Sequence, residues 1–300
     1  MARVRIAITN DVGNLHCRVL LRLIRHLGAE PVLIPYMLKR IEGLDDKTPL
    51  AKLNAEQKTA YEAKIAEHLQ FTAKLLKRVD AFIVPGNKLD IDPARYNAKQ
   101  HKSTRLARSL RNLRYQVESQ MVSTAIKNNM PILAICGGMH LVNVMLGGSV
   151  TQHIPDDARN KKSHVNHMDY RFLRSKKGKE DEIEKSYTNS LKDGAAPNDF
   201  KPTHQVRIKP GSKLHDLYTT ANPDDNPHRV GVLSLHHQGI FGNNLADNFL
   251  EPVAFSKDGL IEAAEIIHNP FGIITQFHWE YNVSGIALPI VNELIKVAKG

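Results

Sequence analysis

Residues 133–141 read LAICGGMHL, and this stretch decides how the rest of the chain is interpreted. An apolar segment at 131–135, typical of a buried strand, ends at Cys136 and is followed at once by a helical pattern. Small residues, Ala134 and Gly138, stand two positions before and after the cysteine, so a tight turn fits there. This is the pattern of a nucleophile elbow with sulfur in place of a hydroxyl. The thiol would project from the carboxyl end of the sheet, where the helix N-terminus favours the reactive thiolate.

The chain contains only two cysteines, so a disulfide scaffold is not expected and a reducing compartment is the simpler interpretation. Cys17 falls inside a helical pattern and suits a buried structural role, which is also the alternative for Cys136. The N-terminal residues lack the apolar stretch of a secretory signal. No run approaches the roughly 20 apolar residues that span a bilayer. We therefore expect a cytoplasmic protein.

Short apolar segments alternate with helical segments around the elbow. Before it, we expect strands at residues 3–9, 31–35 and 81–84, and helices at 15–27, 50–77 and 115–128. After residue 150, we expect shorter strands at 204–208, 231–235, 252–256, 261–268 and 272–277, and a closing helix at 286–298. Several strands are apolar throughout, which is typical of a parallel sheet covered by helices on both faces. The sequence therefore predicts an α/β three-layer sandwich with a mostly parallel central sheet.

The 300 residues fit one large domain or two small ones, and we predict a single domain over 1–300. The segment 155–202 is polar, lysine-rich and weakly periodic, so we interpret it as a surface excursion. The formal net charge of +10 favours acidic partners or anionic substrates. No nucleic-acid-binding signature accompanies this charge, so nucleic-acid binding is not expected.

A reactive cysteine needs a histidine within hydrogen-bond reach, and that histidine needs an orienting group. An apolar strand near the C-terminus ends in His278-Trp279-Glu280. Residues two apart on a strand point to the same face, so the Glu280 carboxylate should lie beside the His278 ring. Such a carboxylate would fix the tautomer and stabilise the imidazolium. We predict a triad of Cys136, His278 and Glu280.

Further motifs follow in a fixed order along the chain. They are the loop 85–96 (PGNKLDIDPARY), Asn143 with the turn 146–148 (LGG), the segment 234–238 (SLHHQ) and the segment 258–263 (DGLIEA). With the elbow and the triad, they resemble the class I glutamine amidotransferase-like superfamily. The closest resemblance is to its γ-glutamyl hydrolase branch, typified by γ-glutamyl-γ-aminobutyrate hydrolase, and it covers nearly the whole chain. It implies a flavodoxin-like fold and a cysteine-dependent hydrolase that cleaves a γ-glutamyl amide bond.

The resemblance also implies roles for individual residues. Cys136 would form a γ-glutamyl thioester, and His278 would pass the thiol proton to the leaving amine, after which water releases glutamate. Backbone N–H groups would form the oxyanion hole at Gly86, Asn87 and Gly137. Substrate-binding positions would be His140, His236, His237 and Gln238, although the His236-His237 pair is equally compatible with a polar loop that does not touch substrate.

Four positions depart from the family pattern. Gly137 replaces an arginine that is common beside the nucleophile, and Asn87 stands where a second glycine is usual. His140 replaces a frequent glutamine, and Trp279 replaces proline between the triad members. None of these changes removes a member of the triad, but together they leave the substrate open.

Two alternatives therefore stay beside the hydrolase. One is a glutaminase module that supplies ammonia to a partner synthase, and the other is a catalytically silent binding or regulatory protein. The stretches 42–77 and 155–202 look longer than in relatives and are expected to be insertions. A homodimer is compatible with the resemblance. No phosphate-binding loop is visible, so no cofactor is expected, and no metal is expected because His164 and His167 look like a solvated pair in a polar loop.

Overall fold

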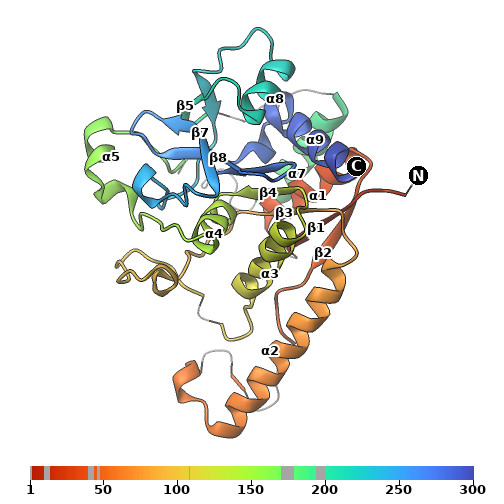
Figure 1. Cartoon of the computed structure of the whole chain (residues 1–300), viewed down its shortest axis with the longest axis vertical. Coiled ribbons are helices and arrows are strands. Elements are labelled where there is room, and N and C mark those ends of the chain that lie inside the picture. The colour runs from red at the N-terminus through yellow and green to blue at the C-terminus, as the bar shows by residue number, and fades with distance from the viewer. Residues whose placement is uncertain are drawn as a thin grey trace.

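We describe a computed structural model of the chain, which covers residues 2–9, 14–39, 44–45, 48–107, 109–169, 179–193 and 201–300 (Figure 1). Its strands are β1 (Arg5–Thr9), β2 (Glu30–Ile34), β3 (Ala81–Val84), β4 (Ile132–Ile135), β5 (His204–Ile208), β6 (Val230–Val232), β7 (Leu250–Ser256), β8 (Ile261–Ile266) and β9 (Gly272–Thr275). Its α-helices are α1 (Leu15–His26), α2 (Ala55–Leu76), α3 (Arg114–Lys127), α4 (Gly137–Met145), α5 (Ala158–Ser163), α7 (Glu180–Asp193), α8 (Lys213–Ala221) and α9 (Leu288–Ala298).

The strands form one sheet in the order β2-β1-β3-β4-β9-β8-β7-β5-β6. The five strands from β2 to β9 pair in parallel. From β9 onward, the ladders to β8, β7, β5 and β6 are antiparallel. The predicted α/β fold is thus confirmed, but the sheet is more mixed than expected, since the short strands after residue 200 add an antiparallel extension.

Helices cover both faces of the parallel part of the sheet. In β1, Ile6 and Ile8 belong to the core beneath α1, α7, α8 and α9, whereas Ala7 belongs to the core beneath α2, α3 and α4. Figure 1 shows these two groups of helices on opposite sides of the strands. Because successive residues of a strand point to opposite faces, strands buried on both sides are apolar throughout.

The predicted helix over 50–77 is interrupted near its start. A short 3₁₀ turn (Leu50–Lys52) precedes α2, and Asn54 caps α2 through a reciprocal pair of hydrogen bonds with Gln57. Figure 1 shows α2 projecting from the body, and only Tyr61, Thr72 and Leu76 are buried along it. This part of the chain lies within the stretch predicted as an insertion.

The segment 155–202, interpreted as a surface excursion, contains α7, which packs on α1. Tyr187 and Leu191 are buried in the same core as α1, and the Glu184 carboxylate pairs with Arg18 and Arg22 of α1. A helix with few but correctly spaced apolar residues can pack on one side while its charged residues face solvent. Residues 170–178 and 194–200 of this segment lie outside the described part of the chain.

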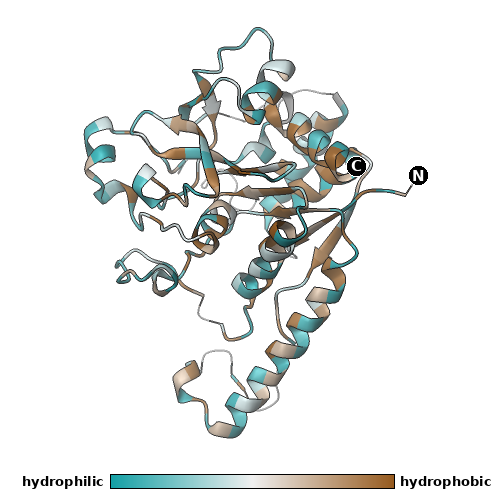
Figure 2. Ribbon diagram, in the orientation of Figure 1, coloured by the Kyte–Doolittle hydropathy of each residue, from teal (hydrophilic) through white to brown (hydrophobic). Residues whose placement is uncertain are grey.

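Hydropathy follows the layers, as Figure 2 shows by the brown strands at the centre and the teal colour on the outer helices and loops. Among the described residues, none of the helices has both the length and the apolar character required to cross a membrane.

Candidate functional site

The predicted elbow is present at Cys136, between β4 and α4. Cys136 has φ 52° and ψ −109°, a left-handed backbone that is rare for a residue with a side chain. A methyl group on Gly138 would lie 2.4 Å from the carbonyl oxygen of Val84, so only glycine lets α4 approach β3 this closely. The backbone N–H of Cys136 also donates to the carbonyl of Thr275 on β9, at 2.7 Å. Strain of this kind, held by neighbouring strands, is typical of functional positions.

His278 and Glu280 lie beside Cys136, but not for the reason predicted from the sequence. The strand β9 ends at Thr275, so His278 stands in a loop and Glu280 in the 3₁₀ turn Trp279–Tyr281. The turn, rather than strand alternation, brings the Glu280 carboxylate to 2.7 Å from Nδ1 of His278. This contact leaves Nε2 as the ring nitrogen available to the thiol.

Gly86 marks the point where the two reactive side chains meet. A Cβ atom on Gly86 would lie 3.0 Å from Cε1 of His278 and 3.2 Å from Cβ of Cys136. A larger residue at Gly86 would therefore occupy the space shared by the imidazole and the nucleophile. The structure thus brings Cys136 and His278 together at this glycine, and Glu280 joins them through its contact with His278.

The surroundings of His278 favour its charged form. Burial alone would lower the pKa of His278, but the Glu280 carboxylate and a hydrogen bond with Cys136 outweigh burial and raise this pKa to about 10. The reverse holds for Glu280, where burial is outweighed by His278 and His16 and the pKa of the carboxyl is lowered. Both groups are buried, with 3% and 0% of their surface exposed, so the pair is shielded from solvent screening.

His16 also belongs to this group, and the sequence analysis did not identify it. Its Nδ1 lies 3.1 Å from Oε1 of Glu280, the oxygen that also contacts His278. The rings of His16 and His278 stack, with centroids 4.5 Å apart. His16 lies at the start of α1 just after β1, at the carboxyl edge of the parallel strands, and this position was the available signal.

The loop after β3 supplies two of the three predicted oxyanion-hole residues, Gly86 and Asn87, whereas Gly137 begins α4. Nη2 of Arg114 donates to the carbonyls of Pro85 and Gly86, at 3.1 and 3.2 Å. Nε of Arg114 donates to Glu118, at 2.7 Å. This buried ion pair fixes the guanidinium group that binds the loop. The carbonyl groups of Pro85 and Gly86 point toward Arg114. The N–H groups of the loop therefore remain available to an oxyanion that forms at the site.

Asn87 and Gly137 face each other across the mouth of this loop. A Cβ atom on Gly137 would lie 3.2 Å from Nδ2 of Asn87, which is tighter than an ordinary contact. The carboxamide oxygen of Asn87 accepts from the N–H of Leu89, at 2.7 Å, and this bond fixes the side chain. The two departures from the family pattern are therefore physically linked, because the Asn87 side chain fills space that a side chain at 137 would need.

A pocket of about 280 Å³ opens in front of Cys136. The predicted residues on its wall are Asn87, Cys136, Gly137, His140, His236, His237, Gln238 and His278. The sequence analysis did not single out the remaining lining residues, which are His16, Lys88, Leu89, Asp90, Arg105, Met168 and Leu235. His140 is buried and contacts the side-chain oxygen of Gln276 through Nε2 at 2.6 Å, and burial lowers the pKa of His140. The His236-His237-Gln238 loop thus lines the pocket instead of lying apart from it.

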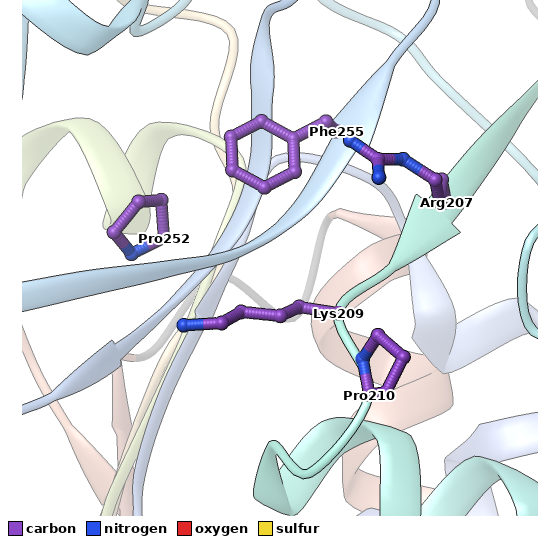
Figure 3. A pocket seen from close by; sticks show the side chains of 5 residues that line it. All are labelled: Arg207, Lys209, Pro210, Pro252 and Phe255. Carbon is purple, nitrogen blue, oxygen red and sulfur yellow. The ribbon is translucent and has the colours of Figure 1, made fainter.

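A separate hollow of about 340 Å³ lies over β5 and β7, lined by Arg207, Lys209, Pro210, Pro252 and Phe255 (Figure 3). Among the described residues, its wall carries two cationic side chains and no cysteine, histidine or carboxylate. The pair His164 and His167 was expected to be solvated, and this is wrong for His167. Its Nε2 contacts the Asp258 carboxylate at 2.9 Å, and only 5% of its surface is exposed.

Comparison with known proteins identifies the family. Residues 63–280 match Peptidase C26. The chain belongs to this family. A glutamine amidotransferase-like protein of Rickettsia prowazekii is 30% identical over 238 residues, covering 75% of this chain and 79% of the relative. γ-Glutamyl-γ-aminobutyrate hydrolase of Escherichia coli K12 is 26% identical over 215 residues, covering 72% of this chain and 69% of the enzyme.

A solved structure supports the same fold. It is a Thermoplasma acidophilum protein described as part of a GMP synthase, with a TM-score of 0.52 and 14% identity, covering 100% of this chain and 96% of the other. The predicted resemblance to glutamine amidotransferases is thus confirmed. This Peptidase C26 protein is a cysteine hydrolase of the glutamine amidotransferase type.

The contact between Asn87 and Gly137 gives a first prediction. In Gly137→Ala, the new methyl group should displace the Asn87 carboxamide, whereas in the Asn87→Gly background it should meet open space. We expect a coupling free energy of about 1 kcal/mol between the two substitutions, measured by urea unfolding of all four proteins. The cycle cancels the helix propensity that alanine adds, and equal effects of Gly137→Ala in both backgrounds would contradict the contact.

The charge of Glu280 gives a second prediction. Because this carboxylate raises the pKa of His278, Glu280→Gln should lower that pKa from about 10 toward its ordinary value near 6.5. The titration of the His278 ring, followed by NMR of its carbon-bound protons, should then move to lower pH by more than about one unit, since the carboxylate no longer stabilises the imidazolium. Glu293→Gln, on the outer face of α9, is the matched control and should leave the profile in place. An unchanged profile in Glu280→Gln would show that the carboxylate does not raise the pKa of His278.

Proposed function

We propose that this protein hydrolyses a γ-glutamyl amide bond, with Cys136 as nucleophile, His278 as acid and base, and Glu280 as the group that orients His278. The observation that carries the proposal is the contact of the buried His278 ring with Cys136 on one side and with the Glu280 carboxylate, at 2.7 Å, on the other. An imidazole held in this way is suited to accept and return one proton.

In the proposed reaction, Sγ of Cys136 attacks the γ-carbonyl carbon and forms a carbon–sulfur bond. The resulting oxyanion would be stabilised by N–H groups of the Gly86-Asn87 loop and of Gly137. The carbon–nitrogen bond then breaks, and His278 gives its proton to the departing amine. Water, deprotonated by His278, attacks the thioester, so glutamate leaves and the thiolate–imidazolium pair is restored.

The shape and charge of the pocket favour a small amino-acid-like substrate. Its volume of about 280 Å³ is at the small end of the range for ligand sites. Its wall carries the carboxylate of Asp90 and the cations of Lys88 and Arg105. A γ-glutamyl group presents an α-ammonium and an α-carboxylate, which would pair with Asp90 and Arg105. Arg105 would then supply the cation that other family members place beside the nucleophile, where this chain has Gly137.

The nucleophile is tested by release of glutamate. Purified protein would be assayed against glutamine, γ-glutamyl amines and γ-glutamyl peptides, and Cys136→Ala should lose at least about 10⁴-fold in kcat/KM without loss of thermal stability. Cys17→Ala, the other cysteine, is the control and should keep its activity. Wild-type activity in Cys136→Ala would refute the assignment. Release of ammonia from glutamine only, and only with a partner present, would favour a glutaminase module.

Substrate recognition is tested separately at Arg105. Arg105→Gln should raise KM about 10-fold or more with little change in kcat, because it removes a contact made equally in the ground and transition states. The control is Arg207→Gln, at the hollow in Figure 3, which should change neither constant. A fall in kcat with unchanged KM would show that Arg105 does not bind the substrate as proposed.

A further inference from the structure

A second cluster of buried imidazole and carboxylate groups lies beside the pocket. The three-histidine cluster consists of His167, His204, His236 and Glu262, and one ligand-type atom from each lies within 4.8 Å of the others. His204 comes from β5 and Glu262 from β8. The other two come from loops joined by a hydrogen bond from the N–H of His236 to the carbonyl of His167, at 2.9 Å. Four segments that are distant in sequence therefore converge.

Polar atoms inside this cluster lack hydrogen-bond partners among the described residues. They are Nε2 of His236 and Oε2 of Glu262, whereas Oε1 of Glu262 meets Nδ1 of His167 only as an ion pair at 3.3 Å. None of Glu262 and only 4% of His236 is exposed, so bulk water does not solvate these atoms. A buried polar atom without a partner destabilises the folded protein, and here such atoms lie close to one another. The arrangement calls for an occupant that all of them can bind.

The spacing of the atoms matches that of ligands around one small cation. Oε1 of Glu262 lies 3.3 Å from Nδ1 of His167 and 3.3 Å from Nε2 of His204. In a tetrahedral zinc site with bonds of about 2.0–2.1 Å, neighbouring ligand atoms are about 3.4 Å apart. Nε2 of His204 also contacts the Ser234 hydroxyl, at 2.8 Å, and an ion would replace this contact. The two separations from Glu262 already suit an ion, and the other ligand atoms, all within 4.8 Å of one another, would move closer when it binds.

The outer nitrogen of each histidine is already held by an acceptor. The contacts are His167 Nε2 with the Asp258 carboxylate at 2.9 Å, His236 Nδ1 with the Gln238 carbonyl at 2.8 Å, and His204 Nδ1 with the Gln205 carbonyl at 3.2 Å. In His204 and His236, this acceptor fixes the proton on one ring nitrogen and leaves the lone pair of the other facing inward. Nδ1 of His167 faces the Glu262 carboxylate, so an ion would displace the proton that this contact favours. Histidines that bind metals almost always have such a partner.

We propose that the three-histidine cluster binds one divalent transition-metal ion of the zinc type in a closed, four-coordinate site. Three imidazole nitrogens and one carboxylate oxygen are ligands that Zn²⁺ accepts, and a site with four protein ligands is typical of a structural ion. The ion would tie together β5, β8 and the two loops, and His236 and Met168 of these loops line the pocket. It would therefore fix the pocket wall rather than take part in the reaction.

The proposal is tested first on the wild-type protein. After treatment with a chelator and reloading with Zn²⁺, about one ion per chain should remain through gel filtration, measured by elemental analysis, and thermal stability should rise. Co²⁺ in its place should give the intense visible absorption of a four-coordinate site without a thiolate charge-transfer band. Retention of no metal would overturn the proposal and leave bound water as the occupant. A thiolate band would also overturn it, because it would place the ion at Cys136.

Variants locate the ion. His204→Ala and Glu262→Gln should each weaken Zn²⁺ binding by more than about 10-fold, since loss of an outer partner alone typically costs 10- to 100-fold. His153→Ala is the matched control, because His153 belongs to a separate group in which its ring stacks on His101, with centroids 5.3 Å apart. His278→Asn should also retain the ion, which excludes the site formed by His16, His278 and Glu280. Equal affinity in wild type and in both ligand variants would refute the assignment.

Discussion

The left-handed backbone at Cys136 is the constraint around which the site is arranged. Two residues later, Gly138 lies against the Val84 carbonyl, where any side chain would clash. This contact fixes α4 against β3. β4 lies between β3 and β9 with parallel ladders on both sides, so the carboxyl ends of three strands meet at the cysteine. β3 then delivers the Gly86 loop, and β9 delivers His278. A shift in either ladder would separate the thiol from its partners.

Much of the fold follows from local sequence, because strands buried on both faces must be apolar. The segment 81–84 was predicted as a strand with the bounds that β3 has, and the elbow was placed correctly. The helices α7 and α8 were not predicted, since α7 is mostly polar and α8 is short. Their few apolar residues become informative only when the surface they pack against is known. The triad was predicted from strand alternation, whereas a 3₁₀ turn produces the same proximity.

Several residues that line the pocket share no sequence motif with the triad. His16, Asp90 and Arg105 stand in three separate parts of the chain, and only the order of the strands brings them to one pocket. The three-histidine cluster was overlooked for the same reason, because its members share no short spacing. The exchange between Asn87 and Gly137 was visible as two departures from a pattern, but their physical link is a contact of one side chain with the empty place left by another.

The bond between His16 and Glu280 joins positions 264 residues apart in the chain. During synthesis, the elbow emerges from the ribosome long before the segment that carries Glu280. A nascent or prematurely terminated polypeptide therefore carries the elbow cysteine without His278, and the His16–Glu280 contact can form only when translation has passed this late segment. Contacts of such long range form late and slowly in folding, so the unfinished chain exposes Cys136 without the partners that surround it in the folded protein.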